Sequence, residues 1–193
     1  MRTSPPDALP IFRSDLQARL LAALFLNDGA PLTTRELAER TAAKPATLHR
    51  ELGRVEDAGL ITHESVGRTK RYRAATESPL HRPLRELLER TLGVEPLLRR
   101  GLAEVEGVER AAIFGSWAEG RSDAGSDIDL LVIGDIDRDA LLAAVREVER
   151  QVHREIDVTA YRPDEFERRR GDGSGFLRTV LRGPLIQLVG EVL

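Results

Sequence analysis

Two aspartates at the head of an apolar segment have the types and spacing for metal-assisted phosphate chemistry. Asp127 and Asp129 stand two residues apart, and Asp129 lies within the apolar run of residues 128–133. Side chains of a strand alternate between its faces, so both carboxylates are expected on one face. A buried carboxylate is costly without a partner, whereas convergent carboxylate oxygens suit Mg²⁺, whose octahedron phosphate oxygens can complete. The pair therefore predicts a Mg²⁺ and phosphate site.

A glycine–serine pair upstream supplies the expected phosphate contact. Gly115 and Ser116 directly follow the strand-like residues 108–114 and begin a short helical turn. Free backbone N–H groups and the positive dipole end at a helix N-terminus both favour phosphate. A glycine–serine pair alone is weak evidence, and its distance from the two acids makes it strong.

A third acid and a repeated motif refine this prediction. Asp157 lies within the strand-like residues 155–161, and it completes a cluster of three carboxylates if the two strands are neighbours. A salt bridge to arginine is the alternative for this residue. The text Asp-Ile-Asp recurs at residues 135–137, but there it follows a strand and precedes the helical residues 138–152. We therefore predict that Asp137 or Asp139 caps that helix and that this second pair is structural.

Composition limits the classes of protein. The chain has 193 residues and no cysteine, which excludes disulfides, thiol nucleophiles and cysteine metal sites. No signal peptide or long apolar segment is visible, so a cytoplasmic protein without a membrane partner is expected. Residues 1–78 carry a net charge of +2 and the rest of the chain −5. This asymmetry indicates two modules with different partners.

The N-terminal third predicts three helices followed by a basic hairpin. Ser14 and Thr33 are the expected N-caps of the first two helices, and Pro45 opens the third. The candidate DNA contacts are polar and basic residues that we expect on the surface of the third helix or of the hairpin. They are Thr47, His49, Arg50, Arg54, Arg68, Lys70 and Arg71. The helix could reach base edges in a major groove, and the hairpin could neutralise phosphates. Alternatively, these charges are a solvated face of a protein-binding platform.

Both halves resemble known families. Leu52, Leu60-Ile61 and the segment Gly67 to Tyr72 resemble the recognition helix and wing of winged helix-turn-helix regulators. Gly115-Ser116, Gly120, Ser126 to Leu130 and Asp157 resemble the polymerase-β-type nucleotidyltransferases, more narrowly the minimal nucleotidyltransferases of prokaryotes.

This resemblance implies an α+β chain and a set of roles. A winged helix-turn-helix domain is expected over residues 11–77, connecting helices over 78–106 and a mixed-sheet nucleotidyltransferase domain over 107–193. Gly115 and Ser116 would hold the β- and γ-phosphates of a nucleoside triphosphate, for which ATP is the first candidate. Asp127, Asp129 and Asp157 would be the catalytic residues that hold two Mg²⁺ ions. Many relatives carry a basic residue where this chain has Glu119, which leaves rate and nucleotide choice open.

The resemblance also implies partners. Double-stranded DNA, read by a homodimer, is one, and a partner toxin protein whose hydroxyl accepts the nucleotide is another. The alternative function is a transcription regulator whose nucleotidyltransferase fold only senses nucleotide.

Overall fold

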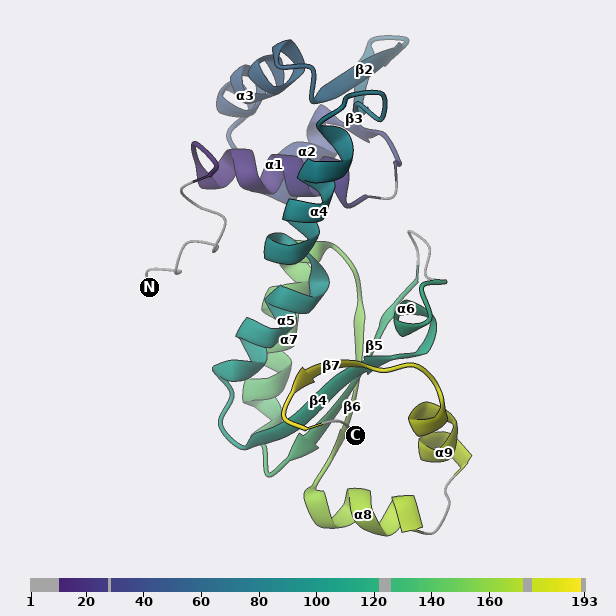
Figure 1. The fold of residues 1–193 in the computed structure, drawn as a ribbon. Helices are drawn as coiled ribbons and strands as arrows, with labels where there is room; N and C mark the ends of the chain where they lie inside the picture. Colours follow the sequence, from purple (N-terminus) through teal and green to yellow (C-terminus); the bar gives the residue numbers. More distant parts are fainter. Residues whose placement is uncertain (1–10, 28, 122–125, 172–174, 192–193) are drawn as a thin grey trace. The chain divides into compact units, whose positions relative to one another are not determined.

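The chain forms two compact units. The computed structural model describes residues 11–27, 29–121, 126–171 and 175–191, and its units are Met1–Pro96 and Leu97–Leu193 (Figure 1). The first unit combines helices with a three-stranded sheet, and the second combines helices with a four-stranded sheet. The predicted α+β class is confirmed.

The first unit consists of helices followed by a hairpin, as predicted. Its elements are α1 (Asp15–Phe25), α2 (Thr34–Thr41), α3 (Pro45–Asp57), β2 (Ile61–Val66) and β3 (Thr69–Ala74). The Ser14 side chain accepts a hydrogen bond from Gln17 N, and Thr33 and Glu36 form a capping box at the start of α2. Pro45 occupies the first turn of α3. The three helix starts are therefore fixed by local chemistry.

One short strand was not predicted from the sequence. Residues Leu32–Thr33 form β1, which pairs antiparallel with β3 and places Leu32 opposite Tyr72. Two residues are too few to show the alternating pattern by which strands are predicted. The resulting sheet order is β1-β3-β2, so the hairpin is held to the helices by a third strand.

Helix α4 (His81–Leu92) belongs to the core of the first unit. Leu88 is completely buried among the residues of that core. The His81 ring stacks on Phe25 at 5.4 Å between centroids, and Arg85 donates a hydrogen bond of 3.0 Å to the Phe25 carbonyl. The helix therefore continues the packing of α1.

The second unit is built on one mixed sheet. Its strands are β4 (Val108–Phe114), β5 (Ile128–Gly134), β6 (Ile156–Tyr161) and β7 (Ile186–Val189), in the order β6-β5-β4-β7. The pair β5 and β6 is parallel, and β4 is antiparallel to both β5 and β7. The longer helices are α5 (Val94–Ala103), α7 (Arg138–Val152), α8 (Pro163–Gly171) and α9 (Gly175–Arg182).

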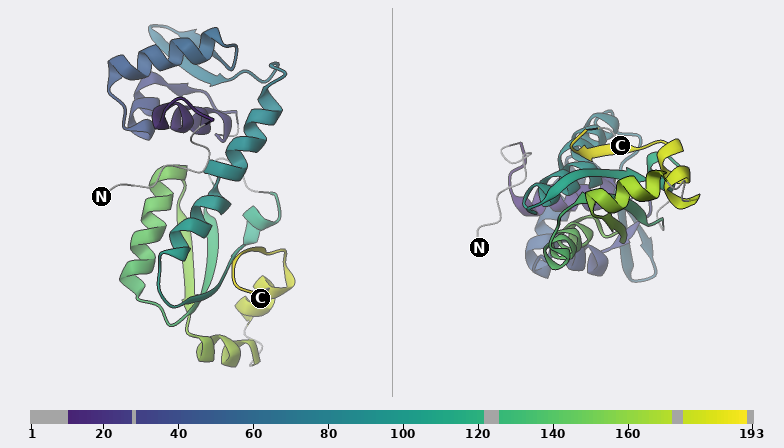
Figure 2. Two further views of the ribbon diagram at one scale, coloured as in Figure 1. Left: turned by 60° about the vertical axis from the view of Figure 1, so that its left-hand side comes forward. Right: turned by 90° about the horizontal axis from the view of Figure 1, so that it is seen from below.

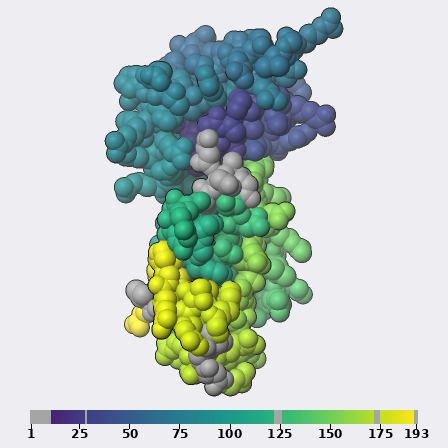
Figure 3. All heavy atoms as spheres, turned by 90° about the vertical axis from the view of Figure 1, so that its right-hand side faces the viewer, coloured from purple at the N-terminus to yellow at the C-terminus, as the bar shows by residue number. Residues whose placement is uncertain are grey.

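Helices cover both faces of this sheet. Leu131 and Ile133 pack against Phe166 of α8 and against Leu177 and Val180 of α9. The left view of Figure 2 shows α7 and α9 on opposite sides of the strands, and Figure 3 shows the yellow α9 region beside the teal residues that follow β4. Strand β5 therefore has the predicted apolar face and also apolar residues on its other face, where Leu131 and Ile133 follow Asp129. None of the described helices has the length and apolarity that crossing a membrane requires.

Candidate active site

The turn after β4 places the glycine–serine pair against an acid. Gly115 begins the short helix α6 (Gly115–Ala118) with a φ of 69°, a conformation that side chains rarely adopt. A Cβ atom at this position would overlap Asp129 Oδ2 and lie 3.2 Å from Asp129 Cγ. The preceding residue, Phe114, is opposite Asp129 in the sheet register. Glycine is therefore required here for a close approach of carboxylate and backbone.

Strand pairing brings the three predicted acids together. Asp129 of β5 is the register partner of Asp157 in the parallel neighbour β6, and Asp127 precedes β5. The expectation of neighbouring strands is thus confirmed. Asp129 is half-buried, whereas Asp127 and Asp157 are exposed. Burial, followed by the negative charges of Asp157 and Asp127, raises the pKa of the Asp129 carboxyl above its usual range.

The donor set fits a divalent cation. The acids supply hard oxygen ligands, and a cation between them would offset both the burial and the repulsion that raise the Asp129 pKa. In the described part of the chain, no three such side chains already form a coordination group. Because Asp129 lies beside the backbone of Gly115, the expected metal ligands and the expected phosphate-binding turn are next to each other.

The second Asp-Ile-Asp motif serves the helix, as predicted. Asp137 accepts hydrogen bonds from Asp139 N at 2.8 Å and from Ala140 N at 3.2 Å at the start of α7. Asp135 forms an exposed ion pair with Arg162 at 3.4 Å. The two motifs thus differ in place and partners despite their identical text.

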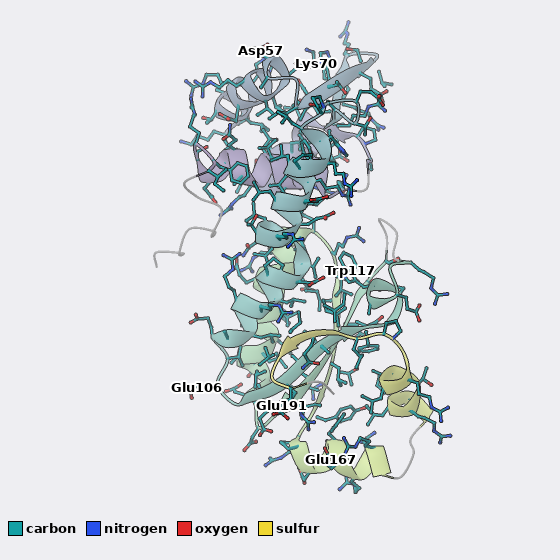
Figure 4. The ribbon with its side chains drawn as sticks, viewed as in Figure 1. Asp57, Lys70, Glu106, Trp117, Glu167 and Glu191 are labelled. Carbon is teal, nitrogen blue, oxygen red and sulfur yellow. The ribbon has the colours of Figure 1, made fainter. Side chains whose placement is uncertain are left out.

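The candidate DNA contacts lie on the surface of the first unit. Those on α3, which are Thr47, His49, Arg50 and Arg54, are exposed, as are Arg68, Lys70 and Arg71 on the hairpin. Figure 4 labels Lys70 at the hairpin. Arg54 is also committed to its own helix, because it forms an ion pair of 3.4 Å with the buried Glu51.

Two family models match the chain. The MarR family model matches residues 13–71, and the model named Polymerase beta, Nucleotidyltransferase matches residues 98–169. The chain joins a MarR-family winged-helix domain to a polymerase-β-type nucleotidyltransferase domain. The predicted fusion of a winged-helix domain with a nucleotidyltransferase domain is therefore confirmed.

Solved structures resemble part of the chain at low identity. The crystal structure of a toxin-antitoxin with AMP-PNP is 19% identical, covers 50% of this chain and 73% of its own, and has a TM-score of 0.39. A mutant of the toxin-antitoxin MntA-HpeT is 18% identical, covers 49% of this chain and 68% of its own, and has a TM-score of 0.34. Among curated proteins, no relative matches.

An arginine that was not predicted, Arg154, lies at the candidate site in the nucleotidyltransferase domain. Arg154 lies 5.0 Å from the ring centroid of Trp117 and donates a hydrogen bond of 3.3 Å to the Ser126 carbonyl. Trp117 directly follows Ser116, and Ser126 directly precedes Asp127 (Trp117 is labelled in Figure 4). One guanidinium therefore joins the phosphate turn to the segment that carries the first acid. Only the tertiary structure shows this contact, because the partners are far apart in the sequence.

The only tryptophan of the chain makes this contact measurable. Arg154→Ala is expected to shift the Trp117 emission to longer wavelength, because water replaces the cation over the indole, an interaction worth about 0.5–2 kcal/mol. Arg154→Lys keeps a cation and should give a smaller shift, and Arg138→Ala on the distant end of α7 should give none. An unchanged spectrum in the alanine variant would show that the pair does not form in solution.

A groove was also missed. It has a volume of about 740 Å³ and is lined by Asp127, Asp157 and residues at the C-terminal end of α7, among them Arg146 and Arg150. The four-residue spacing of these arginines places them on one helix face, which was visible in the sequence. Asp127 and Asp157 are therefore open to solvent through this groove.

Proposed function

We propose that the protein transfers a nucleotide from a Mg²⁺-bound triphosphate to a hydroxyl group of a partner protein. ATP is the first triphosphate to test. The main support for the proposal is that Asp127, Asp129 and Asp157 lie together at the N-terminal ends of β5 and β6, and that Asp129 lies against the Gly115 turn. The family resemblance makes a partner toxin the first acceptor to test. We further propose that the winged-helix domain binds double-stranded DNA as a homodimer.

The chain's own residues have separate tasks in this reaction. The backbone N–H groups of Gly115 and Ser116 hold the triphosphate, and the helix turn behind them adds a favourable dipole. Asp127, Asp129 and Asp157 would hold two Mg²⁺ ions, which supply charge neutralisation for the attacking and leaving oxygens when bound. The acceptor oxygen attacks the α-phosphorus, the bond to the β-phosphate oxygen breaks, and pyrophosphate leaves. Asp157, which is exposed, would take the hydroxyl proton.

Labelled nucleotide tests this proposal directly. The protein, Mg²⁺ and a candidate partner are incubated with ATP labelled on the α-phosphate, and in parallel with ATP labelled on the γ-phosphate. Nucleotide transfer predicts that only the α-label reaches the acceptor, since pyrophosphate carries the γ-label away. Transfer of the γ-label would indicate a phosphotransferase instead. Absence of both, with DNA affinity that changes on adding ATP, would favour a nucleotide-sensing regulator.

The hairpin is expected to supply the electrostatic part of DNA binding. Arg68→Ala combined with Arg71→Ala should weaken binding at low salt by about tenfold or more and reduce the slope of log K against log salt by about two, because two phosphate contacts are lost. Fluorescence anisotropy with duplex DNA over a salt series measures both quantities. Arg82→Ala combined with Arg90→Ala on α4 is the control of equal charge. Equal slopes for the two double variants would place the DNA contacts elsewhere.

A further inference from the structure

The groove beside the acids separates two sides of the nucleotidyltransferase site. Asp127 and Asp157 line it, whereas Gly115 and Ser116 are not among its lining residues. Asp129, which lies against Gly115, is the register partner of Asp157, so the acids connect the phosphate turn with the groove. Arg154 also lines the groove and extends it toward Trp117. In an in-line displacement, the attacking oxygen and the leaving pyrophosphate lie on opposite sides of the phosphorus. With the triphosphate at Gly115 after β4, an acceptor that attacks in line would approach from the side of Asp157 on β6, where the groove opens.

Helix α7 lines the groove with Arg146, Glu149 and Arg150, and Arg150 also forms an ion pair with Glu147. Arg146 and Arg150 are one helical turn apart, His153 follows at the end of the helix, and all three line the groove. They form a row that leads toward Asp127 and Asp157, whose charges a bound divalent cation would neutralise. A negatively charged segment can therefore lie along this row with its hydroxyl at the acids.

The remaining charges favour a polypeptide over a nucleic acid. Glu149 and Glu155 also line the groove, and residues 97–193 contain 14 arginines against 19 acidic residues, a net charge of −5. Nucleic-acid binding sites are generally continuous basic surfaces that neutralise successive phosphates. With Asp127 and Asp157 neutralised by a cation, the arginines Arg146, Arg150 and Arg154 remain beside two glutamates, of which Glu149 accepts a hydrogen bond from Ile156 N. Positive charge interrupted by carboxylates over a short distance matches a short acidic segment better than a polyphosphate backbone.

We propose that this groove is the acceptor site and that it selects a protein segment in which acidic residues stand next to the modified hydroxyl. This inference rests on the proposed function. Arg146 and Arg150 attract the acidic residues, and the neighbouring carboxylates receive the hydroxyl. The attraction is electrostatic and largely exposed, so salt weakens it.

Binding of a defined peptide tests the groove independently of catalysis. The probe is a fluorescent peptide with one tyrosine between aspartates, titrated with the full chain in Mg²⁺. Its affinity should fall about tenfold or more in Arg146→Glu combined with Arg150→Glu, because attraction becomes repulsion. Arg138→Glu combined with Arg168→Glu changes the net charge equally outside the groove and should bind like the wild type. A peptide with asparagines in place of the aspartates should bind weakly to all three proteins.

Three outcomes would overturn the proposal. They are equal peptide affinity in the two double variants, equal affinity for the asparagine peptide, or competition by a single-stranded oligonucleotide that binds more tightly. Melting curves of each variant show whether it is folded. The same proteins are then given Mg²⁺ and α-labelled ATP. Peptide binding that depends on Arg146 and Arg150, without label transfer from the wild type to any acceptor, would leave a docking groove and reject the transferase function.

Discussion

Replacing Asp127 and Asp129 together by asparagine is expected to abolish nucleotide transfer. Both residues lose the charge that a divalent cation needs, while asparagine keeps the shape of each side chain. Loss of a single preorganised electrostatic contact costs about 10²–10³ in rate, so loss of both predicts a fall on the order of 10³-fold or more. Transfer of the α-label from ATP measures the effect. The fold should persist and gain stability without metal, because burial and the repulsion by Asp157 and Asp127, which together raise the Asp129 pKa, no longer act on a charged group.

The chain supplies a matched control for this experiment. Asp135→Asn combined with Asp137→Asn makes the same change in the second Asp-Ile-Asp motif. Asparagine caps a helix about as well as aspartate, so α7 keeps its N-cap at Asp137 and the stability of the unit should hardly change. Label transfer should equal that of the wild type. If the first double variant retained transfer, or the second lost it, the assignment of the metal ligands would be wrong.

Gly115→Ala is expected to have the second large effect. The added methyl group would overlap Asp129 Oδ2, and the φ of 69° is unfavourable for alanine by about 1–2 kcal/mol. The turn and the carboxylate cannot both keep their places, so transfer should fall by at least about 10²-fold, the scale of misplacing a reacting group by roughly 1 Å. Binding of a fluorescent ATP analogue, measured separately, should weaken as well.

Gly120→Ala isolates the steric part of that effect. Gly120 has a φ of 67°, almost the same as Gly115, but nothing lies within 4 Å of the position that an added Cβ atom would take. The two variants therefore share the backbone strain and differ in the contact with Asp129. Similar melting temperatures combined with transfer lost only in Gly115→Ala would show that the close approach matters. Equal loss of transfer in both variants would attribute the effect to strain of the backbone.

Much of the architecture is local and could be predicted from the sequence. Thr33 and Glu36 cap α2 through bonds between residues three apart, and Asp137 caps α7 through backbone N–H groups two and three residues further on. The apolar run of β5 follows from the period of a buried strand. Such features depend on neighbours in the chain, so residue type and spacing are enough to predict them.

The candidate site depends on both levels. Residue types predicted that Gly115, Asp127 and Asp129 act on phosphate and metal, and alternation placed the two acids on one face. The place of Asp157 depended on which strand lies beside β5, and the parallel register of β5 and β6 decided it. The sequence could state that condition but could not test it, because strand neighbours are chosen by packing across the whole sheet.

The sequence alone was enough to predict a winged-helix domain and a nucleotidyltransferase domain, and it led us to expect metal and phosphate at Asp127 and Asp129. It did so because capping, periodicity and motif spacing are properties of short segments. The folded protein was needed to show that Asp129 lies against Gly115, that Arg154 contacts Trp117 and Ser126, and that an arginine-lined groove opens beside Asp127 and Asp157. The physical reason is the same for all three. Each contact joins residues from different strands and helices, and its energy is gained only after the sheet has brought those elements together.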